Sequence, residues 1–370
     1  MVYEHARPAV CTHIRYSSWS SHPPVVREHN YMVIEERVSL KEFTTMRVGG
    51  VARFFVRAHS VADLKDAVLF SEQQHLPYFV LGGGSNIVFS DTEFPGVVIK
   101  SELKGVSFSS TDYAKTIVTA GAGEVFDDVI AQTVGVGCSG LENLSAIPGT
   151  VGGAVVGNIG AYGKEIKDSL ESVDVFDTRS HEVATLPAQD CQFSYRESIF
   201  KKAEGKHLVV VAARFRVGSA YPCFYEYADL AAHFAADSVV TAPRVREAVC
   251  AIRAYKLPDW RVLPTAGSFF KNPIVSVEIA AALKEKFPAL PQYKAPSGVK
   301  VSAAYLIDHV AQLRGVRRGD VGIFEKQALV IVNYGNATQE AIQTFAEYIC
   351  HEVFLRTGVS LEREVVFVGV

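Results

Sequence analysis

The chain has 370 residues, of which 48% are hydrophobic and 21% charged, and 37 Lys and Arg oppose 40 Asp and Glu for a formal net charge of -3. This length suffices for two or three lobes, and the balanced charge excludes a general attraction to nucleic acid or to an anionic membrane. No apolar run approaches the roughly 20 residues that span a bilayer, and the first residues lack the pattern of a signal peptide. We therefore expect a soluble, cytoplasmic protein.

The six cysteines are scattered along the chain, at positions 11, 138, 191, 223, 250 and 350. No two of them have the paired spacing typical of a zinc site or a redox dithiol. We expect small, buried hydrophobic side chains in a reducing compartment, and no metal site.

The first half of the chain mixes helix and strand signals. Residues 1–35 show no helical or strand periodicity, and we expect a loosely ordered extension there. Residues 60–76 predict an amphipathic helix, because Ser60 and Asp63 have capping-box spacing ahead of apolar positions on one face. Between residues 95 and 217, short apolar runs separated by turn residues predict a β-rich lobe.

From about residue 241 onward, helices dominate. Residues 242–259 carry Pro243 in the first turn, residues 302–315 end at a glycine, and residues 337–358 end at Gly358. The order of the elements predicts an α+β protein.

Two glycine clusters carry most of the functional information. The first, "LGGGSN" at residues 81–86, lies between two predicted strands, and the second, "IPGTVGGAVVGNIGAYG" at residues 147–163, holds six glycines. Glycine lets the backbone approach a phosphate or a planar cofactor closely. A plain hairpin turn is the alternative for the first cluster, although it requires only one or two special positions. The Rossmann fingerprint is absent. Ile87 stands where a third glycine should follow Gly82 and Gly84, and Phe126 stands where one should follow Gly121 and Gly123.

Ser268 lies in "AGSFFKNP", residues 266–273, without the glycine spacing of a nucleophile elbow. By itself it is better interpreted as a turn serine than as a catalytic one.

Several ordered motifs resemble those of UDP-N-acetylenolpyruvoylglucosamine reductases, the FAD enzymes commonly called MurB. The resemblance covers about residues 36–370 and is carried by "TTMRVGG", "LGGGSN", "GLENLSAIPGTVGGAVVGNIGAYG", "FSYRESIF", "AGSFFKNP", "LIDH" and "LEREVVFVG". It implies an α+β chain with an FAD-binding fold of the vanillyl-alcohol-oxidase (PCMH) type in two lobes, plus a third α/β lobe for the substrate.

The resemblance also divides the chain into segments. We expect the extension to be followed by two FAD-binding lobes, a substrate-binding domain and a C-terminal strand that returns to the active site. The boundaries are 1–35, 36–218 (lobes of about 36–101 and 102–218), 219–354 and 355–370.

The cofactor contacts implied by the resemblance come from the glycine clusters and one arginine that resembles a family position near the flavin. For this arginine, a solvated strand arginine is an equal alternative. The candidates are Gly82, Gly83, Gly84, Ser85, Asn86, Gly121, Gly123, Gly149, Thr150, Gly152, Gly153, Asn158, Gly160, Tyr162 and Arg214.

The implied chemistry is hydride transfer from NADPH to FAD and then to the enolpyruvyl group of a UDP-sugar, which gives UDP-N-acetylmuramate. Arg196 matches the family arginine that binds the carboxylate, Ser268 matches the proton donor, and Glu364 matches a third active-site residue. Glu362 is the alternative to Glu364, and Val366 departs from the family pattern because many members carry arginine there.

Five further residues are the expected substrate contacts: Tyr227, Arg253, Lys256, Asn272 and Gln327. Arg253 and Lys256 lie three apart on one predicted helix and could both face a diphosphate, although a surface salt-bridge face is the alternative for Arg253. Tyr227 lies in "FYEYADL", which resembles the tyrosine-loop subclass of the family. We expect a monomer that binds a small-molecule substrate, with no nucleic-acid or membrane partner.

Two other functions share some of these features. A flavin oxidase of the same fold, acting on an alcohol or a sugar, would carry the glycine clusters but would not require Arg196, Ser268 and Glu364 in these motifs. A non-catalytic flavin or nucleotide carrier would have no use for a proton donor.

Overall fold

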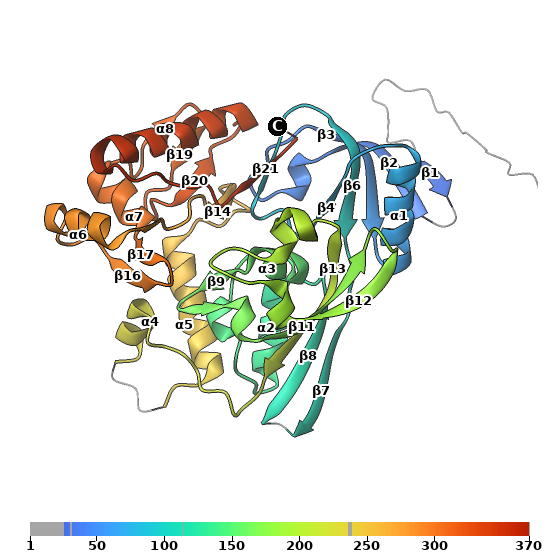
Figure 1. Ribbon diagram of the computed structural model, residues 1–370, viewed down its shortest axis with the longest axis horizontal. Coiled ribbons are helices and arrows are strands. Elements are labelled where there is room, and N and C mark those ends of the chain that lie inside the picture. The colour runs from blue at the N-terminus through green and yellow to red at the C-terminus, as the bar shows by residue number, and fades with distance from the viewer. Residues whose placement is uncertain (1–25, 30–31, 113, 236–238, 370) are drawn as a thin grey trace, which may run out of the picture.

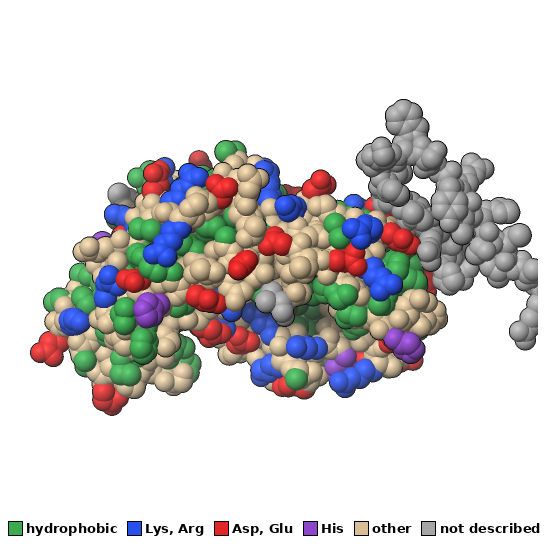
Figure 2. All heavy atoms as spheres, turned by 90° about the horizontal axis from the view of Figure 1, so that it is seen from above, with side chains coloured by type: hydrophobic (Ala, Val, Ile, Leu, Met, Phe, Trp, Pro, Cys, Tyr) green, Lys and Arg blue, Asp and Glu red, His purple; other side chains and the backbone are tan. Residues whose placement is uncertain are grey.

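The computed structural model describes residues 26–29, 32–112, 114–235 and 239–369. Two five-stranded sheets, together with a third region that holds a four-stranded and a three-stranded sheet, form the body of the described molecule with their helices, and the C-terminal strand lies between the first sheet and the third region (Figure 1). The expected α+β class is confirmed. Charged side chains of both signs are interspersed over the face seen in Figure 2, in keeping with the small net charge.

The first sheet has the strand order β1-β2-β3-β6-β4, in which β3 and β4 are both parallel to β6. Helix α1 packs against β3 and β6, and the capping box expected at Ser60 and Asp63 is present at its N-terminus. The elements are β1 (Val26–His29), β2 (Met32–Ser39), β3 (Val51–Ala58), α1 (Val61–Gln73), β4 (Tyr78–Leu81) and β6 (Phe94–Ser101).

The start of this sheet corrects the expected extension. Residues 26–29 and 32–35 belong to β1 and β2, while residues 1–25 lie outside the described part of the chain. Met32 and Ile34 are buried and Val33 between them is exposed. This alternation is that of a strand with one face on the core, and it is too short to stand out from the sequence before it.

The second sheet is antiparallel throughout, with the order β12-β11-β13-β8-β7. Helices α2 and α3 lie beside it, and one hydrophobic core runs continuously from this sheet into the first. The elements are β7 (Val106–Asp112), β8 (Lys115–Gly121), α2 (Phe126–Gly135), α3 (Val151–Gly157), β9 (Gly160–Ala161), β10 (Lys164–Glu165), β11 (Leu170–Asp177), β12 (Glu182–Pro187) and β13 (Leu208–Val217).

The third region has a four-stranded sheet, β14-β20-β19-β18, and a three-stranded sheet, β15-β17-β16. Its core also contains Met46 and Val48 from the first region, both fully buried. The elements are β14 (Thr265–Ser268), β15 (Ile274–Val275), α6 (Val277–Lys286), β16 (Gln292–Ala295), β17 (Gly298–Val301), α7 (Ala303–Tyr305), β18 (Arg317–Arg318), β19 (Val321–Ile323), β20 (Val330–Asn333) and α8 (Gln339–Thr357).

Of the three helices expected in this half, two are confirmed. Helix α5 (Ala242–Lys256) has proline in its first turn, and α8 ends at Gly358, which has a φ of 70°. The helix expected over residues 302–315 is wrong in extent, because α7 is followed by a π-helical turn, Leu306–Val310, after which the helix ends.

Helices α4 (Ala228–His233) and α5 share a separate small core, and α5 packs against α2 and the 3-10 helix Glu142–Leu144. Strand β21 (Val366–Val368) pairs in parallel with β5 (Ile87–Phe89), directly after the first glycine cluster. Within the described part of the chain, none of the helices is both long and apolar enough to cross a membrane.

Candidate active site

The two glycine clusters contact each other. Ser85 Oγ donates a hydrogen bond to the Pro148 carbonyl (2.9 Å). A Cβ atom on Gly83 would lie 2.6 Å from Gly149 Cα, and one on Gly82 would lie 2.7 Å from Thr150 Oγ1. The close approach of these two protein segments therefore requires glycine at both positions. The sequence alone attributes these glycines to the close approach of a cofactor.

The neighbouring glycines have the same cause. A Cβ on Gly123 would collide with the Leu103 amide, and one on Gly152 would lie 3.0 Å from Ala122 Cβ. Gly121 likewise faces the Leu103 carbonyl, and Gly84, which has a φ of 64°, faces the Phe43 carbonyl. Gly153 is less crowded, since its nearest neighbour would be Thr150 Oγ1 at 3.7 Å.

An unused polar group lies where the clusters meet. Thr150 Oγ1 is buried and has no hydrogen-bond partner among the described residues, although Thr150 is the N-cap residue of α3. Buried hydroxyls rarely go without a partner, so a polar group of a ligand fits here. Lys100, which the sequence reasoning missed, donates to the Gly82 carbonyl, and burial lowers its pKa.

Two expected cofactor contacts are instead bonded to the protein. Asn158 is fully buried with a φ of 40°, and its Nδ2 donates to Ser194 O (2.7 Å) and Glu165 Oε2 (3.2 Å). Arg214 forms a bidentate pair with Asp174, with both distances 2.7 Å, on the face of β13 opposite the buried Ala213 and Phe215. These contacts favour the strand-arginine interpretation of Arg214.

Arg196 lies in a tight turn between Ser194 and Glu197, which exchange backbone hydrogen bonds of 3.1 Å, and its φ is 57°. Its Nη2 donates to the Gly160 carbonyl (2.8 Å), and its Nε lies 2.9 Å from Glu364 Oε1. The Nε contact is an ion pair without good hydrogen-bond alignment, because the same buried Nε has no aligned acceptor among the described residues. A Cβ on Gly160 would lie 3.0 Å from Arg196 Nη1, so this glycine makes room for the guanidinium.

The choice between the two glutamates follows from their surroundings. The Glu364 side chain is 18% exposed and pairs with Arg196, whereas the Glu362 side chain is 71% exposed and pairs with Lys271 (2.7 Å). Burial raises the pKa of Glu364, against the opposing effect of the nearby cations Arg196, Lys201 and Lys271.

Ser268 is exposed at the end of β14, directly after Gly267, whose φ is 76°. The next residue, Phe269, accepts the Glu364 N–H at its carbonyl (2.9 Å), and Phe270 bridges to Arg363. The structure therefore brings the Ser268 segment, Glu364 and Arg196 together from three distant parts of the chain.

Three residues of this cluster were missed. Lys271 bridges Glu197 and Glu362, Lys201 Nζ donates to the Arg196 carbonyl (2.6 Å), and the Tyr195 ring lies between the cations of Arg196 (5.2 Å) and Lys300 (4.8 Å). Tyr195 and Lys271 lie within recognised motifs, but Lys300 is distant in sequence from Tyr195, and Glu197 and Glu362 are distant from Lys271, so these contacts leave no local signal.

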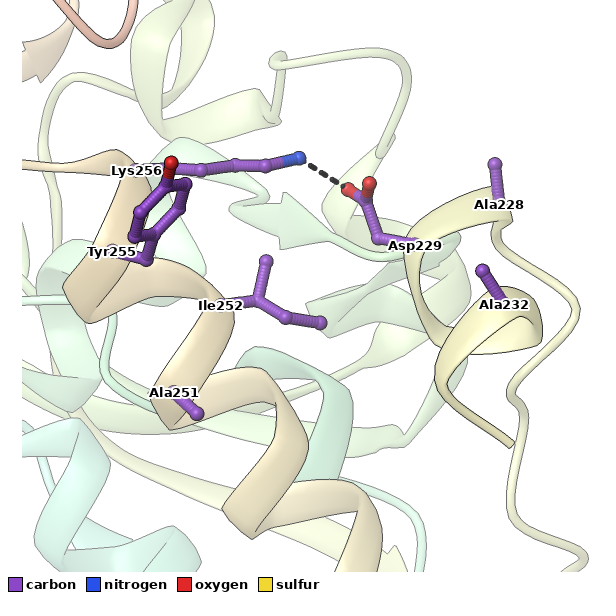
Figure 3. Close-up of a pocket in the computed structure, with 7 residues that line it drawn as sticks. All are labelled: Ala228, Asp229, Ala232, Ala251, Ile252, Tyr255 and Lys256. Atoms are coloured by element: carbon purple, nitrogen blue, oxygen red, sulfur yellow. Dashed lines mark hydrogen bonds and ion pairs between the residues drawn. The ribbon is translucent and has the colours of Figure 1, made fainter. Parts of the chain in front are cut away.

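The expected substrate residues form a second group beside α4 and α5. The Tyr162 and Tyr227 rings meet edge to face at 5.5 Å, and burial raises the pKa of Tyr162 to about 12. Lys256 reaches across the groove between α5 and α4 to Asp229 (2.8 Å), as Figure 3 shows. Arg253 does not point along the same groove, since its Nε donates to the Ala146 carbonyl (3.3 Å) ahead of the second glycine cluster.

The last two substrate candidates flank Ser268. Asn272 Oδ1 accepts the Ala303 N–H (2.9 Å), and its own N–H donates to Tyr195 Oη (3.3 Å). Gln327 Oε1 accepts the Leu329 N–H (3.3 Å), in the turn before the strand that pairs with Ser268. Asn86 Nδ2 donates to the Glu364 carbonyl (3.1 Å), which ties the first glycine cluster to the C-terminal segment.

Side chains that could hold a metal do not gather anywhere in the described ranges. The five described cysteines are free; Cys138 and Cys191 are buried and the other three partly so, while Cys11 lies outside the described residues.

Joined glycine clusters with an unpartnered hydroxyl, and a partly buried Arg-Glu pair, fit a cofactor-binding enzyme. Comparison with known families identifies the cofactor class. Residues 52–185 match the family model described as an FAD binding domain, so the chain is an FAD-binding protein. Residues 258–368 match the model of the UDP-N-acetylenolpyruvoylglucosamine reductase C-terminal domain.

Curated relatives agree with these matches. The chain is 41% identical over 335 residues to the UDP-N-acetylenolpyruvoylglucosamine reductase of Neisseria gonorrhoeae, covering 90% of this chain and 96% of that one. It is 42% identical over 331 residues to the enzyme of the same name from Chromobacterium violaceum, covering 88% and 96%. The crystal structure of the reductase (MurB) from Thermus caldophilus matches with a TM-score of 0.64 at 27% identity, covering 91% of this chain and 99% of that one. The chain belongs to the UDP-N-acetylenolpyruvoylglucosamine reductase family.

Proposed function

We propose that this protein reduces UDP-N-acetylglucosamine enolpyruvate to UDP-N-acetylmuramate with NADPH and FAD, a step in peptidoglycan precursor synthesis. The observation that carries the proposal is the partly buried Arg196-Glu364 pair, 2.9 Å apart, beside the segment that presents Ser268. These three groups supply a carboxylate-binding cation, an acid-base partner and a proton donor, which an oxidase or a carrier does not need.

FAD, held by the two glycine clusters and Thr150, would supply the redox chemistry, which is hydride transfer from NADPH to the enolpyruvyl methylene carbon. Addition of the hydride leaves an electron pair on the neighbouring carbon, spread into its carboxylate. Arg196 stabilises that charge, because a planar guanidinium suits a carboxylate and is held here in a partly buried position. Ser268 then transfers its hydroxyl proton to the carbon, and solvent restores the serine proton.

The surroundings of Glu364 support a role beside this proton transfer. Burial raises the pKa of Glu364, whereas Arg196 at 2.9 Å favours the carboxylate. Because burial and Arg196 shift the pKa of Glu364 in opposite directions, this carboxyl group can share a proton at little cost. It can also polarise a neighbouring hydroxyl.

Diphosphate recognition is assigned to Tyr227 and Lys256, with Tyr162 packed against Tyr227. The pair Lys256-Asp229 bridges α5 and α4, so the lysine is already directed across the groove (Figure 3). The tyrosine segment "FYEYADL" supports membership of the tyrosine-loop subclass. Asn272 and Gln327 complete the substrate contacts, next to Ser268.

The proposal includes the division into an FAD-binding part, residues 36–218, a substrate-binding part, residues 219–354, and a returning C-terminal strand. Strand β21, which pairs with β5 beside Asn86, supports the last of these. We further propose that the protein is a monomer, because every residue assigned a role is supplied by one chain. We also propose that it is cytoplasmic.

An anaerobic titration tests the function. Purified flavoprotein should bleach on addition of NADPH and regain its colour when the enolpyruvyl sugar nucleotide is added. Rapid recolouring by air alone, without this compound, would indicate an oxidase, and a protein that hardly bleaches would be a carrier.

A further inference from the structure

The backbone of Arg196 adopts a conformation that non-glycine residues seldom occupy. Its φ of 57° lies in the left-handed region, which is unfavourable for a residue that carries a side chain. Arg196 stands at the third position of a four-residue turn, where glycine or asparagine is usual. Something in the surrounding structure must therefore hold this residue in place.

The Lys201 side chain makes the contact that holds the Arg196 backbone from outside the turn. Its Nζ donates to the Arg196 carbonyl at 2.6 Å, across the turn from the guanidinium. Lys201 ends the 3-10 helix Ile199–Lys201, which is anchored because the buried Ser198 hydroxyl donates to the Val156 carbonyl in α3 (2.7 Å). The 3-10 helix that carries Lys201 is thus tied to α3, the helix whose N-cap residue is Thr150.

Lys201 also contributes charge to the site. Three cations face Glu364: Arg196 from the turn, Lys201 from the 3-10 helix and Lys271 from the segment after β14. Lys271 is already paired with Glu197 and Glu362, and Tyr195 is a further titratable group that interacts with Glu364. Lys201 is therefore a cation near Glu364 whose own hydrogen bond goes to a backbone carbonyl.

We propose that Lys201 is a positioning residue for the reaction: its bond to the Arg196 carbonyl locks the turn that holds the Arg196 guanidinium beside Glu364. The inference rests on the proposed function for its consequence in catalysis, but the positioning itself can be measured without substrate.

The test uses full-length flavoprotein with Lys201→Met, Lys201→Arg and the matched control Lys202→Met. Lys202 is the adjacent lysine, and its Nζ donates to Gln192 Oε1 (2.6 Å), away from Arg196. In Lys201→Met we expect FAD content and flavin reduction by NADPH within about twofold of the unchanged protein, and reoxidation by the enolpyruvyl substrate slowed on the order of 10- to 100-fold. Lys201→Arg should recover at least about tenfold of that loss, because arginine can donate to the same carbonyl.

The second measurement is the pKa of Glu364, followed by carboxyl carbon NMR, with its signal assigned by its loss in Glu364→Gln. It should rise in Lys201→Met, because a favourable positive charge is removed, and should stay unchanged in Lys202→Met. Matching reoxidation rates and matching Glu364 titrations in the two methionine variants would overturn the proposal. Equal slowing of both half-reactions without rescue by arginine would also overturn it, in favour of a general packing role. If the unchanged protein is not reoxidised by the substrate, the proposed function fails, and the Glu364 titration still decides the role of Lys201.

Discussion

Ser268 is a weak acid in an exposed position, and its assignment as proton donor depends on what surrounds it. The residue that follows it is fixed on both sides, since Phe269 N donates to Leu329 O (2.7 Å) and Glu364 N donates to Phe269 O (2.9 Å). A hydroxyl held in this way can protonate a carbanion without a search for the right geometry.

We expect Ser268→Ala to bind FAD and to be reduced by NADPH at a near-normal rate, because that step takes no proton from the serine. Reoxidation by the enolpyruvyl substrate should fall by at least about 100-fold, and Ser268→Cys should recover part of it. Stopped-flow absorbance of the flavin measures each half-reaction. Equal slowing of both would indicate a packing role, and an unchanged second half-reaction would remove Ser268 from the mechanism.

Tyr227 offers a test of the proposed substrate contacts beside α4 and α5. Its ring packs on Tyr162 at 5.5 Å, and because the residue is 40% exposed, a ligand can reach it. Tyr227→Phe should weaken substrate binding by about 1 kcal/mol, the usual value of one hydrogen bond, and leave flavin reduction similar.

Tyr225→Phe is the matched control, because Tyr225 is equally exposed (39%) but packs on Phe234 (6.0 Å). Substrate affinity can be read from quenching of flavin fluorescence. Loss of bound FAD in Tyr227→Phe would contradict the assignment of this tyrosine to the substrate-binding part of the molecule.

The motifs selected residues that lie together, but they did not distinguish ligand contacts from structural ones. Arg196, Glu364 and the Ser268 segment come together, and Glu364 is the less exposed of the two glutamates. Arg214 and Asn158 were expected to touch the cofactor, yet their bonds go to Asp174 and to Ser194. Sequence spacing cannot reveal such pairing, because the partners lie 40 and 36 residues away.

Among the elements, α5 is joined to the second glycine cluster by a chain of polar contacts. Arg246 forms a bidentate pair with Asp127 of α2 (2.5 and 3.0 Å), Asp127 accepts the Ala146 N–H (2.6 Å), and Arg253 donates to the Ala146 carbonyl (3.3 Å). Ala146 itself has a φ of 58°, so these contacts hold a strained residue three positions before Gly149. Helix α5 therefore supports the cofactor side as well as the substrate side.

Replacing the Asp127 carboxylate, which links Arg246 to Ala146, should destabilise the protein. We expect Asp127→Asn to lower the free energy of unfolding at pH 7 by about 1–3 kcal/mol, because the guanidinium of Arg246 loses a charged partner. Urea unfolding followed by circular dichroism measures the change. Asp128→Asn, at the adjacent exposed position, is the control and should change stability by less than about 0.5 kcal/mol.

The same pair predicts a pH dependence. Burial alone would raise the pKa of Asp127, but the bonds from Arg246 and the Ala146 N–H bring it below its usual 3.8. A carboxyl with a lowered folded-state pKa stabilises the fold above its unfolded pKa, and this contribution disappears as the pH falls through the folded value. The stability difference between Asp127→Asn and the unchanged protein should therefore shrink as the pH is lowered from 7 to below 3.8. A difference that stays constant over this range would contradict the charged pairing.

Element prediction succeeded where local chemistry determines the structure. The capping box of α1, the proline of α5 and the terminal glycine of α8 all mark real helix ends. The strand over residues 32–35 was missed because its alternation is short, and the π-helical turn at residues 306–310 was missed because its sequence has ordinary helical periodicity. In both cases tertiary packing decides the outcome.

At the scale of the whole molecule, the first and third regions share a core, with the active site at their junction. Met46 and Val48, from the first region, are fully buried among third-region residues, and the Met46 carbonyl accepts a hydrogen bond from Asn333 (3.1 Å). Thr45 Oγ1 donates to the Thr265 carbonyl (2.6 Å), three residues before Ser268. The regions should therefore unfold together, although the chain is long enough for independent domains.

Met46→Ala tests this coupling. The substitution leaves a cavity in a core that both regions share, so it should cost about 2–5 kcal/mol. Thermal unfolding can be followed twice in one sample, by circular dichroism for the whole chain and by flavin fluorescence for release of FAD. Because the core is shared, both transitions should move down by the same number of degrees and remain coincident. Val262→Ala, at a position that is 82% exposed, should move neither. If Met46→Ala lowered only the circular dichroism transition and left FAD release unchanged, the third region would unfold by itself, and the placement of Ser268 against the flavin lobe would not depend on this shared core.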